Sequence, residues 1–234
     1  GLAEFGLDNK SALRSKNMFA LGLVCWLFER PLEEAMHMLQ NKFAKKPVIA
    51  QANIKALTDG YNYGNNIHAS VSTYRIESKK AEPGFYTDVN GNKATSYGLI
   101  AAAEKAGLQL FLGSYPITPA TDILHELSKR KDLGVITVQA EDEIDGICTS
   151  IGASFAGCLA ATSTSGPGLA LKSEAIGLAV IAELPLVIID VQRGGPSTGL
   201  PTKSEQTDLM QALYGRNGES PAVVIAASTP TDCF

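Results

Sequence analysis

The chain has 234 residues, enough for one or two domains with a substantial core. Hydrophobic residues make up 45% of it and charged residues 19%, the balance of a globular protein, and no apolar run is long and uncharged enough to span a membrane. The net charge of −4 argues against a nucleic-acid-binding surface.

The first third of the chain is expected to be helical. Helices are predicted over residues 17–29, 32–43 and 47–60. Their wide apolar faces, with no strand among them, indicate that they cover a sheet formed elsewhere in a longer polypeptide. The tract Asn62–Asn92 is rich in Asn, Gly, Ser and Tyr and lacks helical periodicity, so it is a candidate linker.

The four cysteines show no metal-binding pattern. Cys25, Cys148, Cys158 and Cys233 lack C-x-x-C spacing, and the three histidines lack metal-ligand spacing. We expect the cysteines to be small buried apolar side chains in the reducing cytoplasm. An iron–sulfur cluster held by this chain alone is not expected.

From about residue 93 helices and strands alternate. Helices are predicted over 95–106, 119–130, 144–155, 168–183 and 204–213, and strands over 108–113, 135–139, 160–165, 186–190 and 222–227. This order is typical of a doubly wound, mainly parallel α/β sheet. The apolar, β-branched run 186–190 favours a place in the middle of that sheet. Ser228–Asp232 resembles a helix start, but the chain ends before we expect that helix to form.

Three turns with unusual composition follow predicted strands. They are Tyr115-Pro116-Ile117-Thr118-Pro119, Glu141-Asp142-Glu143 and Thr164-Ser165-Gly166-Pro167-Gly168. The carboxyl ends of parallel strands share one edge of the sheet, where ligands of such folds bind. The third turn could let a ligand approach its backbone, or could be a tight turn that needs small residues. It matches neither the G-x-G-x-x-G fingerprint nor a phosphate-binding loop, which excludes a typical nicotinamide dehydrogenase.

Each polar candidate has a structural alternative. Acids at the start of a helix can simply favour its dipole, whereas a functional carboxyl must point inward at a heteroaromatic ring nitrogen. Thr118 can cap a helix, or its hydroxyl can be held in place between two prolines. Arg193 follows a strand directly, where it can form a surface ion pair or recognise a carboxylate or phosphate. The Gly/Ser-rich tract after it could be a mobile loop.

Together the motifs resemble the alpha subunit of 2-oxoacid:ferredoxin oxidoreductases, with the closest likeness to the 2-oxoglutarate type. The matching segments are YPITP, QAEDE, TSTSGPG, SEAIGLAVIAELPLVIIDVQR and RGGPSTGLPTKSEQ. They cover roughly Lys93 to Phe234, which corresponds to the pyrimidine-binding domain of a thiamine-diphosphate enzyme. KNMFALG and NYGNNIHA resemble the end of a fused gamma domain. The resemblance implies a helical remnant of that domain over 1–66, a linker over 67–92 and the pyrimidine-binding domain, cut short at its end, over 93–234.

The resemblance assigns roles to individual residues. In this family a glutamate bonded to the aminopyrimidine favours the imino tautomer, whose nitrogen takes the proton of the thiazolium carbon. Gly152 and Gly157, taken as anchors, select Glu143 for this role rather than Glu141. Thr118 and Arg193 match residues at the substrate carboxylate. The cofactor is expected to lie against Tyr115, Pro116, Ile117, Thr164, Gly166, Pro167 and Gly168.

The resemblance also implies partners. A beta subunit is expected to bind the diphosphate with its Mg²⁺ and to carry an iron–sulfur cluster, so this chain holds only the pyrimidine end and no metal ligands. The 2-oxo acid is the substrate, coenzyme A accepts the acyl group, and ferredoxin accepts the electrons. We expect a fragment that is inactive alone and that works in a cytoplasmic hetero-oligomer, without nucleic acid or membrane as partners.

Two other functions stay open. Another thiamine-dependent carboligase or decarboxylase would carry a second thiamine domain in the same chain. A non-catalytic assembly module would use the same turns only for subunit contacts, and replacing Glu143 separates it from an enzyme. The sequence does not distinguish pyruvate, 2-oxoglutarate and branched-chain 2-oxo acids as substrates.

Overall fold

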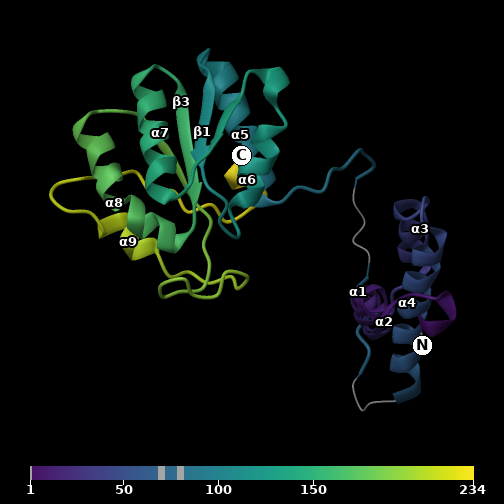
Figure 1. The fold of residues 1–234 in the computed structure, drawn as a ribbon. Coiled ribbons are helices and arrows are strands. Elements are labelled where there is room, and N and C mark those ends of the chain that lie inside the picture. Colours follow the sequence, from purple (N-terminus) through teal and green to yellow (C-terminus); the bar gives the residue numbers. More distant parts are fainter. Residues whose placement is uncertain (1, 68–71, 78–81) are drawn as a thin grey trace. The chain divides into compact units, whose positions relative to one another are not determined.

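The chain folds into two compact units, Gly1–Gly84 and Phe85–Phe234 (Figure 1). The computed structural model describes residues 2–67, 72–77 and 82–234, so residues 68–71 and 78–81 of the predicted linker lie outside the described residues. The domain bounds 1–66, 67–92 and 93–234 stay predictions. In the described part of the chain, no helix combines the length and the apolar character that crossing a membrane requires.

The first unit is helical, as predicted. Its elements are η1 (Leu2–Phe5), α1 (Asn9–Arg14), α2 (Lys16–Leu27), α3 (Glu33–Lys42) and α4 (Pro47–Ile67). The prediction that α4 ends near Gly60 is wrong, because the helix continues through the first residues of the predicted linker.

Close packing against α2 explains the length of α4. A Cβ added at Gly22 of α2 would collide with the carbonyl of Leu57, and one at Gly60 with the carbonyl of Phe19. Gly64, one turn after Gly60, lies against the ring of Trp26 in the same way. From the sequence alone these glycines favour a loop, but in the structure they let two helix backbones approach each other.

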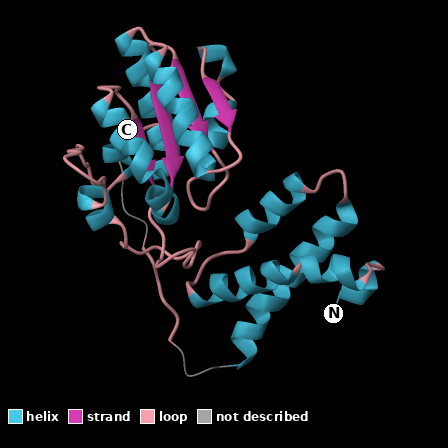
Figure 2. Ribbon diagram, turned by 60° about the vertical axis from the view of Figure 1, so that its left-hand side comes forward, coloured by secondary structure: helices cyan, strands magenta, loops and turns pink. Residues whose placement is uncertain are grey.

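The second unit contains the predicted α/β sheet. Its elements are α5 (Gly91–Ala106), β1 (Leu110–Ser114), α6 (Thr121–Ser128), η2 (Lys131–Leu133), β2 (Ile136–Gln139), α7 (Glu143–Phe155), β3 (Leu159–Thr164), α8 (Gly166–Ile181), β4 (Val187–Asp190), α9 (Leu209–Tyr214) and α10 (Pro230–Cys233). The strands, magenta in Figure 2, pair in parallel in the order β2-β1-β3-β4. The predicted fold class is confirmed.

Helices cover both faces of this sheet. On one face Leu110 and Leu112 of β1 belong to a core that also contains Leu99 of α5 and Ile123 of α6. On the other face Gly113 lies against the first turns of α7, where an added Cβ would come within 2.6 Å of the hydroxyl of Ser150. A second apolar cluster joins α7 to α8 through Ile147, Leu169, Ala175 and Ile176. Burial on both faces accounts for the nearly continuous apolar strands.

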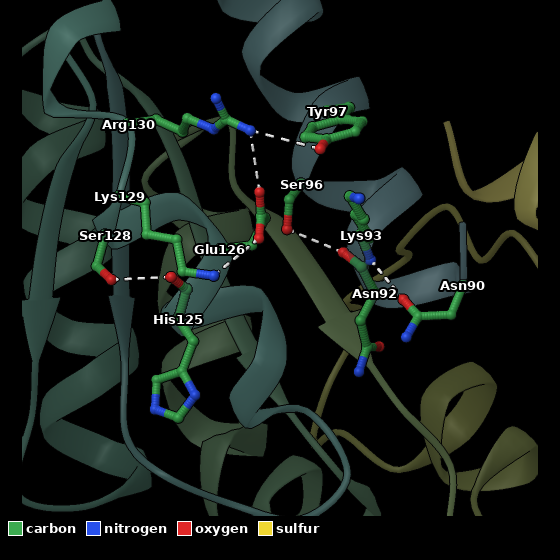
Figure 3. A network of polar contacts seen from close by, with 10 residues as sticks. All are labelled: Asn90, Asn92, Lys93, Ser96, Tyr97, His125, Glu126, Ser128, Lys129 and Arg130. Carbon is green, nitrogen blue, oxygen red and sulfur yellow. Dashed lines mark hydrogen bonds and ion pairs between the residues drawn. The ribbon is translucent and has the colours of Figure 1, made fainter. Parts of the chain in front are cut away.

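Polar contacts hold α5 and α6 together (Figure 3). Arg130, just beyond α6, donates to Glu126 at 3.1 Å and to the hydroxyl of Tyr97 on α5 at 3.4 Å. At the start of α5, the side-chain amide of Asn92 donates to the carbonyl oxygen of Pro119 at 2.8 Å. This last bond ties the YPITP turn to the helix layer behind it.

Two predictions about the sheet's outer side are wrong. Strand β4 is an edge strand rather than a central one. The predicted strand 222–227 does not form, and Val223 and Ile225 within it are 92% and 83% exposed. A β-branched run becomes a strand only where it pairs with a neighbouring edge. Residues 222–227 do not pair with a strand of the sheet, and β4 pairs only with β3 among the described strands.

Three smaller expectations are also corrected. The helix predicted over 204–213 is shortened to α9, which begins after Asp208. The last helix does form one turn, because Thr229 and Asp232 build a capping box and α10 packs against Gly98 of α5. Cys25 is buried as predicted, but Cys148 on α7 is exposed.

Candidate active site

The predicted site residues gather at the carboxyl edge of the sheet. The register pairs Ser114 of β1 with Gln139 of β2, and Thr164 of β3 with Asp190 of β4, so these strands end at the same level. The three turns found in the sequence follow β1, β2 and β3 directly. Their residues therefore meet although they are far apart in the chain.

The three acids before α7 have three different environments. Asp142 is the helix N-cap, and its carboxylate accepts from the backbone N–H of Asp145 at 2.8 Å. Glu141 is exposed. Glu143, the first residue of α7, is partly buried, and its Oε1 accepts a hydrogen bond of 2.6 Å from the hydroxyl of Tyr115. Helix capping thus accounts for Asp142, and of the three acids it is Glu143 whose carboxylate is held in place by another turn of the sheet edge.

Tyr115 connects the first turn to the acidic helix start. Burial, and next the hydrogen bond to Glu143, raise the pKa of Tyr115 well above its usual range, while Arg193 acts in the opposite direction. The phenol therefore stays protonated at physiological pH and donates to the carboxylate throughout. In the same turn Ile117 is buried, whereas Pro116 and Thr118 are exposed.

The TSGPG turn closes tightly around Glu143. Thr164, Ser165 and Gly166 are buried, and α8 begins directly after Ser165, with Pro167 in its first turn. A Cβ at Gly168 would collide with the hydroxyl of Thr164 and lie 2.9 Å from Cγ of Glu143. Glycine is thus required at this position by contact with the protein's own side chains.

Arg193 and Thr118 are brought together by the fold. Arg193 follows β4 and is only 6% exposed, which excludes the surface ion pair that the sequence left open. Its Nη1 donates to the carbonyl oxygen of Thr118 at 2.8 Å, and its Nε is buried with no hydrogen-bond partner among the described residues. A buried guanidinium with an unpaired N–H is suited to an anionic ligand.

Lys172 is a site residue that the sequence analysis missed. Its side chain is fully buried within α8, and its Nζ donates to the carbonyl oxygen of Glu143 at 2.7 Å. Burial lowers the pKa of Lys172 to about 8, while the charge of Glu143 acts in the opposite direction. The available signal was one lysine in a mainly apolar helix, four residues after Gly168 and so on the same helix face.

Two acids also missed in the sequence flank the Arg193 loop. Asp190 ends β4 and Asp208 precedes α9, and each has one buried carboxyl oxygen without a hydrogen-bond partner among the described residues. Asp208 also accepts from the side chain of Gln192 at 2.6 Å. Burial, and next the contact with Asp208, raise the pKa of Asp190 to about 8. One shared proton would satisfy both unpaired oxygens.

This proton makes the stability of the unit depend on pH. The folded chain keeps the proton up to about pH 8, whereas an unfolded aspartate releases it near 3.8. The contribution of the proton to the free energy of unfolding is therefore full below pH 4 and is lost toward pH 8. Asp190→Asn keeps a donor for Asp208 and cannot titrate. Thermal unfolding of this chain gives the melting temperature of Asp190→Asn minus that of the wild type. We expect this difference to be about 5 °C larger at pH 8 than at pH 5. An equal difference at both pH values would contradict the shared proton.

The acidic side chains of this edge do not form a metal site. Within the described ranges, which leave out His68, no group of three or more His, Cys, Asp or Glu side chains could hold a metal ion. The predicted residues that converge are instead the Glu143 carboxylate, the Arg193 guanidinium, the Tyr115 phenol and a turn of small residues. Such a set can orient a ligand with hydrogen-bond donors and a carboxylate.

The chain is similar to known proteins over most of its length. Residues 101–234 match the family described as pyruvate flavodoxin/ferredoxin oxidoreductase, thiamine diphosphate-binding. The 2-oxoglutarate oxidoreductase subunit KorA of Mycobacterium tuberculosis is 58% identical over 98% of this chain and 35% of its own length. The 2-oxoglutarate synthase subunit KorA of Archaeoglobus fulgidus is 46% identical over 62% of this chain and 41% of its own length.

A solved structure resembles the chain as well. The 2-oxoglutarate:ferredoxin oxidoreductase from Magnetococcus marinus, with 2-oxoglutarate, coenzyme A and succinyl-CoA bound, is 41% identical, with a TM-score of 0.69 over 94% of this chain and 38% of that one. The chain thus spans little more than a third of the length of these relatives. The family predicted from the motifs is confirmed: the chain belongs to the thiamine diphosphate-binding family of pyruvate flavodoxin/ferredoxin oxidoreductases.

Proposed function

We propose that this chain supplies the aminopyrimidine side of the thiamine diphosphate site in a 2-oxoacid:ferredoxin oxidoreductase that acts on 2-oxoglutarate. The observation that carries the proposal is the partly buried carboxylate of Glu143, held by Tyr115 at 2.6 Å beside the TSGPG turn. The names of the three relatives described above refer to 2-oxoglutarate, which supports the choice of substrate.

The residues at this edge fit the aminopyrimidine ring. Tyr115 occupies one carboxylate oxygen of Glu143, and the other, Oε2, has no hydrogen-bond partner among the described residues. A carboxylate oxygen of this kind accepts a hydrogen bond from a ring nitrogen that carries a proton. The proposed walls of the site are Tyr115, Pro116, Ile117, Thr164, Gly166, Pro167 and Gly168.

When bound, thiamine diphosphate would supply a carbon nucleophile and an electron sink for the decarboxylation of the 2-oxo acid. The chain's own residues orient and exchange protons. Glu143 holds a proton at the ring nitrogen, and Tyr115, which stays protonated, fixes the carboxylate in that direction. The buried turn around Gly168 keeps water away from the carboxylate.

Arg193 and Thr118 form the proposed contact with the substrate. Arg193 is joined to Thr118 by the bond from Nη1 to the Thr118 carbonyl oxygen, its Nε is unpaired among the described residues, and Thr118 is exposed. A guanidinium held at one nitrogen can present its other N–H groups to a carboxylate in a fixed plane. The pair would therefore orient the carboxylate that leaves as CO₂.

The remaining parts of the enzyme are proposed to lie on a beta subunit. It would bind the diphosphate and Mg²⁺ and carry an iron–sulfur cluster, with coenzyme A as acyl acceptor and ferredoxin as electron acceptor. The net charge of residues 91–234 supports this division. Residues 91–234 contain nine basic and fifteen acidic residues, a net charge of −6 that is unsuited to a diphosphate.

Reconstitution tests this function. The full-length subunit that contains this chain is co-expressed with its beta subunit, and reduction of a viologen dye is followed with pyruvate, 2-oxoglutarate and branched-chain 2-oxo acids. We expect reduction that requires both 2-oxoglutarate and coenzyme A. Reduction with a different acid alone would correct the substrate, and an assembled complex that is inactive with every acid would support a non-catalytic module.

A further inference from the structure

The buried ammonium group of Lys172 is not used by the proposed chemistry. Its Nζ donates to two acceptors, the carbonyl oxygen of Glu143 at 2.7 Å and the hydroxyl of Thr162 on β3 at 3.0 Å. No carboxylate lies within ion-pair distance of it in the described part of the chain. The cation is therefore held mainly by neutral oxygens.

A cation in this place is costly. Removing an ammonium from water disfavours its charged form, as the lowered pKa of Lys172 shows. Replacing buried charges by apolar residues of similar volume is often neutral or stabilising. Packing alone between α7 and α8, which elsewhere join through Ile147 and Leu169, does not require a lysine.

Lys172 acts on the residue that carries the key carboxylate. Glu143 is held at two points, with Tyr115 bonded to its side chain and Lys172 bonded to its main chain. Lys172 and Gly168 lie one turn apart on α8, so the face of α8 that leaves room for the Glu143 side chain also fixes its backbone. A shift of α7 at its first residue would displace the carboxylate directly.

We infer that Lys172 is a positioning residue that fixes Glu143 at the start of α7 and so aims its carboxylate at the cofactor. The inference rests on the proposed function of Glu143. Lys172 itself touches neither cofactor nor substrate in this assignment. Its loss should therefore affect the activation of the cofactor and leave the recognition of the 2-oxo acid nearly unchanged.

The test uses the assembled enzyme and measures more than turnover. Bound thiamine diphosphate exchanges the hydrogen of its thiazolium carbon for deuterium in the absence of 2-oxo acid, and acid quenching followed by NMR gives the rate. We expect Lys172→Met, which keeps an unbranched side chain one atom shorter and without a donor, to slow this exchange about 10-fold to 100-fold, the range that a small misplacement causes. The kcat should fall in parallel, with KM for the 2-oxo acid within about threefold.

Thr162→Val is the matched control. It removes the other acceptor of Lys172 without touching Glu143, and exchange should stay within about threefold of the wild type. Exchange at the wild-type rate in Lys172→Met would overturn the inference. If Glu143→Gln also exchanges at the wild-type rate, the proposed function itself fails; if only Glu143→Gln is slow, the positioning role alone fails.

A second substitution covers the case in which Lys172→Met does not assemble. Lys172→Gln keeps a donor without the charge and should slow exchange less than Lys172→Met does. If only Lys172→Gln assembles, we expect its exchange to be about tenfold slower than that of the wild type. Failure of both variants to assemble, or assembly with normal exchange and a lower melting temperature, would show that Lys172 serves folding only.

Discussion

Glu143→Gln should remove most of the turnover of the assembled enzyme while leaving its fold intact. The amide keeps the shape of the side chain and can still bond to Tyr115, but it can no longer accept and hold a proton at the cofactor. Positioned acid–base groups contribute about 10²-fold to 10⁴-fold, which sets the size of the expected loss in kcat. Steady-state kinetics with circular dichroism as a check on folding measures both effects.

Glu141→Gln provides the control on the same turn. Glu141 is exposed, and its backbone N–H donates to the carboxylate of Asp145 at 3.2 Å. Turnover close to that of the wild type is expected for this variant. Near-normal turnover in Glu143→Gln would remove its proposed role, and a loss that falls on Glu141→Gln instead would move the role two residues earlier.

Arg193→Lys should lower kcat/KM for the 2-oxo acid by about 10-fold to 100-fold, the equivalent of one charged hydrogen bond of roughly 1.5–3 kcal/mol. The guanidinium bonds Thr118 with Nη1 and keeps Nε free, whereas an ammonium is a point charge that cannot hold both directions in one plane. The melting temperature should stay close to that of the wild type. The measurement is steady-state kinetics together with thermal unfolding of the same preparations.

Arg216→Lys is the matched control for this variant. Arg216 also donates to main-chain carbonyls, those of Ala212, Leu213 and Ser220, but it lies outside the proposed site. Its replacement should affect stability and leave kcat/KM unchanged. An Arg193→Lys enzyme that behaves like Arg216→Lys would assign Arg193 to structure.

Local patterns in the sequence were sufficient for the fold class and for the turns at the sheet edge. Apolar runs, and turn residues such as Pro116 and Gly166, act within a few positions, so they can be recognised without the structure. The end of α4 was predicted too early, because in the sequence Gly60 and Gly64, which permit close helix packing, cannot be told from glycines of a loop. The run 222–227 has strand composition, but pairing depends on a neighbour that the composition does not reveal.

Motifs in the sequence marked candidate residues, but not the contacts between them. The contact of Arg193 with Thr118, separated by 75 positions, and that of Lys172 with Glu143 depend on which strands are neighbours and at which level they end. The acid pair Asp190 and Asp208 is a further case, because each aspartate alone resembles an ordinary residue of a turn. Only the fold places them together and withdraws them from water.

The division of the cofactor site between two subunits is the central claim, and calorimetric titration tests it most directly. The pyrimidine side offers a few hydrogen bonds of about 0.5–1.5 kcal/mol each, against a cost of association of roughly 4–15 kcal/mol. Titration of the isolated 234-residue chain with thiamine diphosphate and Mg²⁺ should therefore give no measurable binding, whereas the complex with the beta subunit should bind. Micromolar binding to the isolated chain would show that it carries a complete cofactor site and would contradict the divided one.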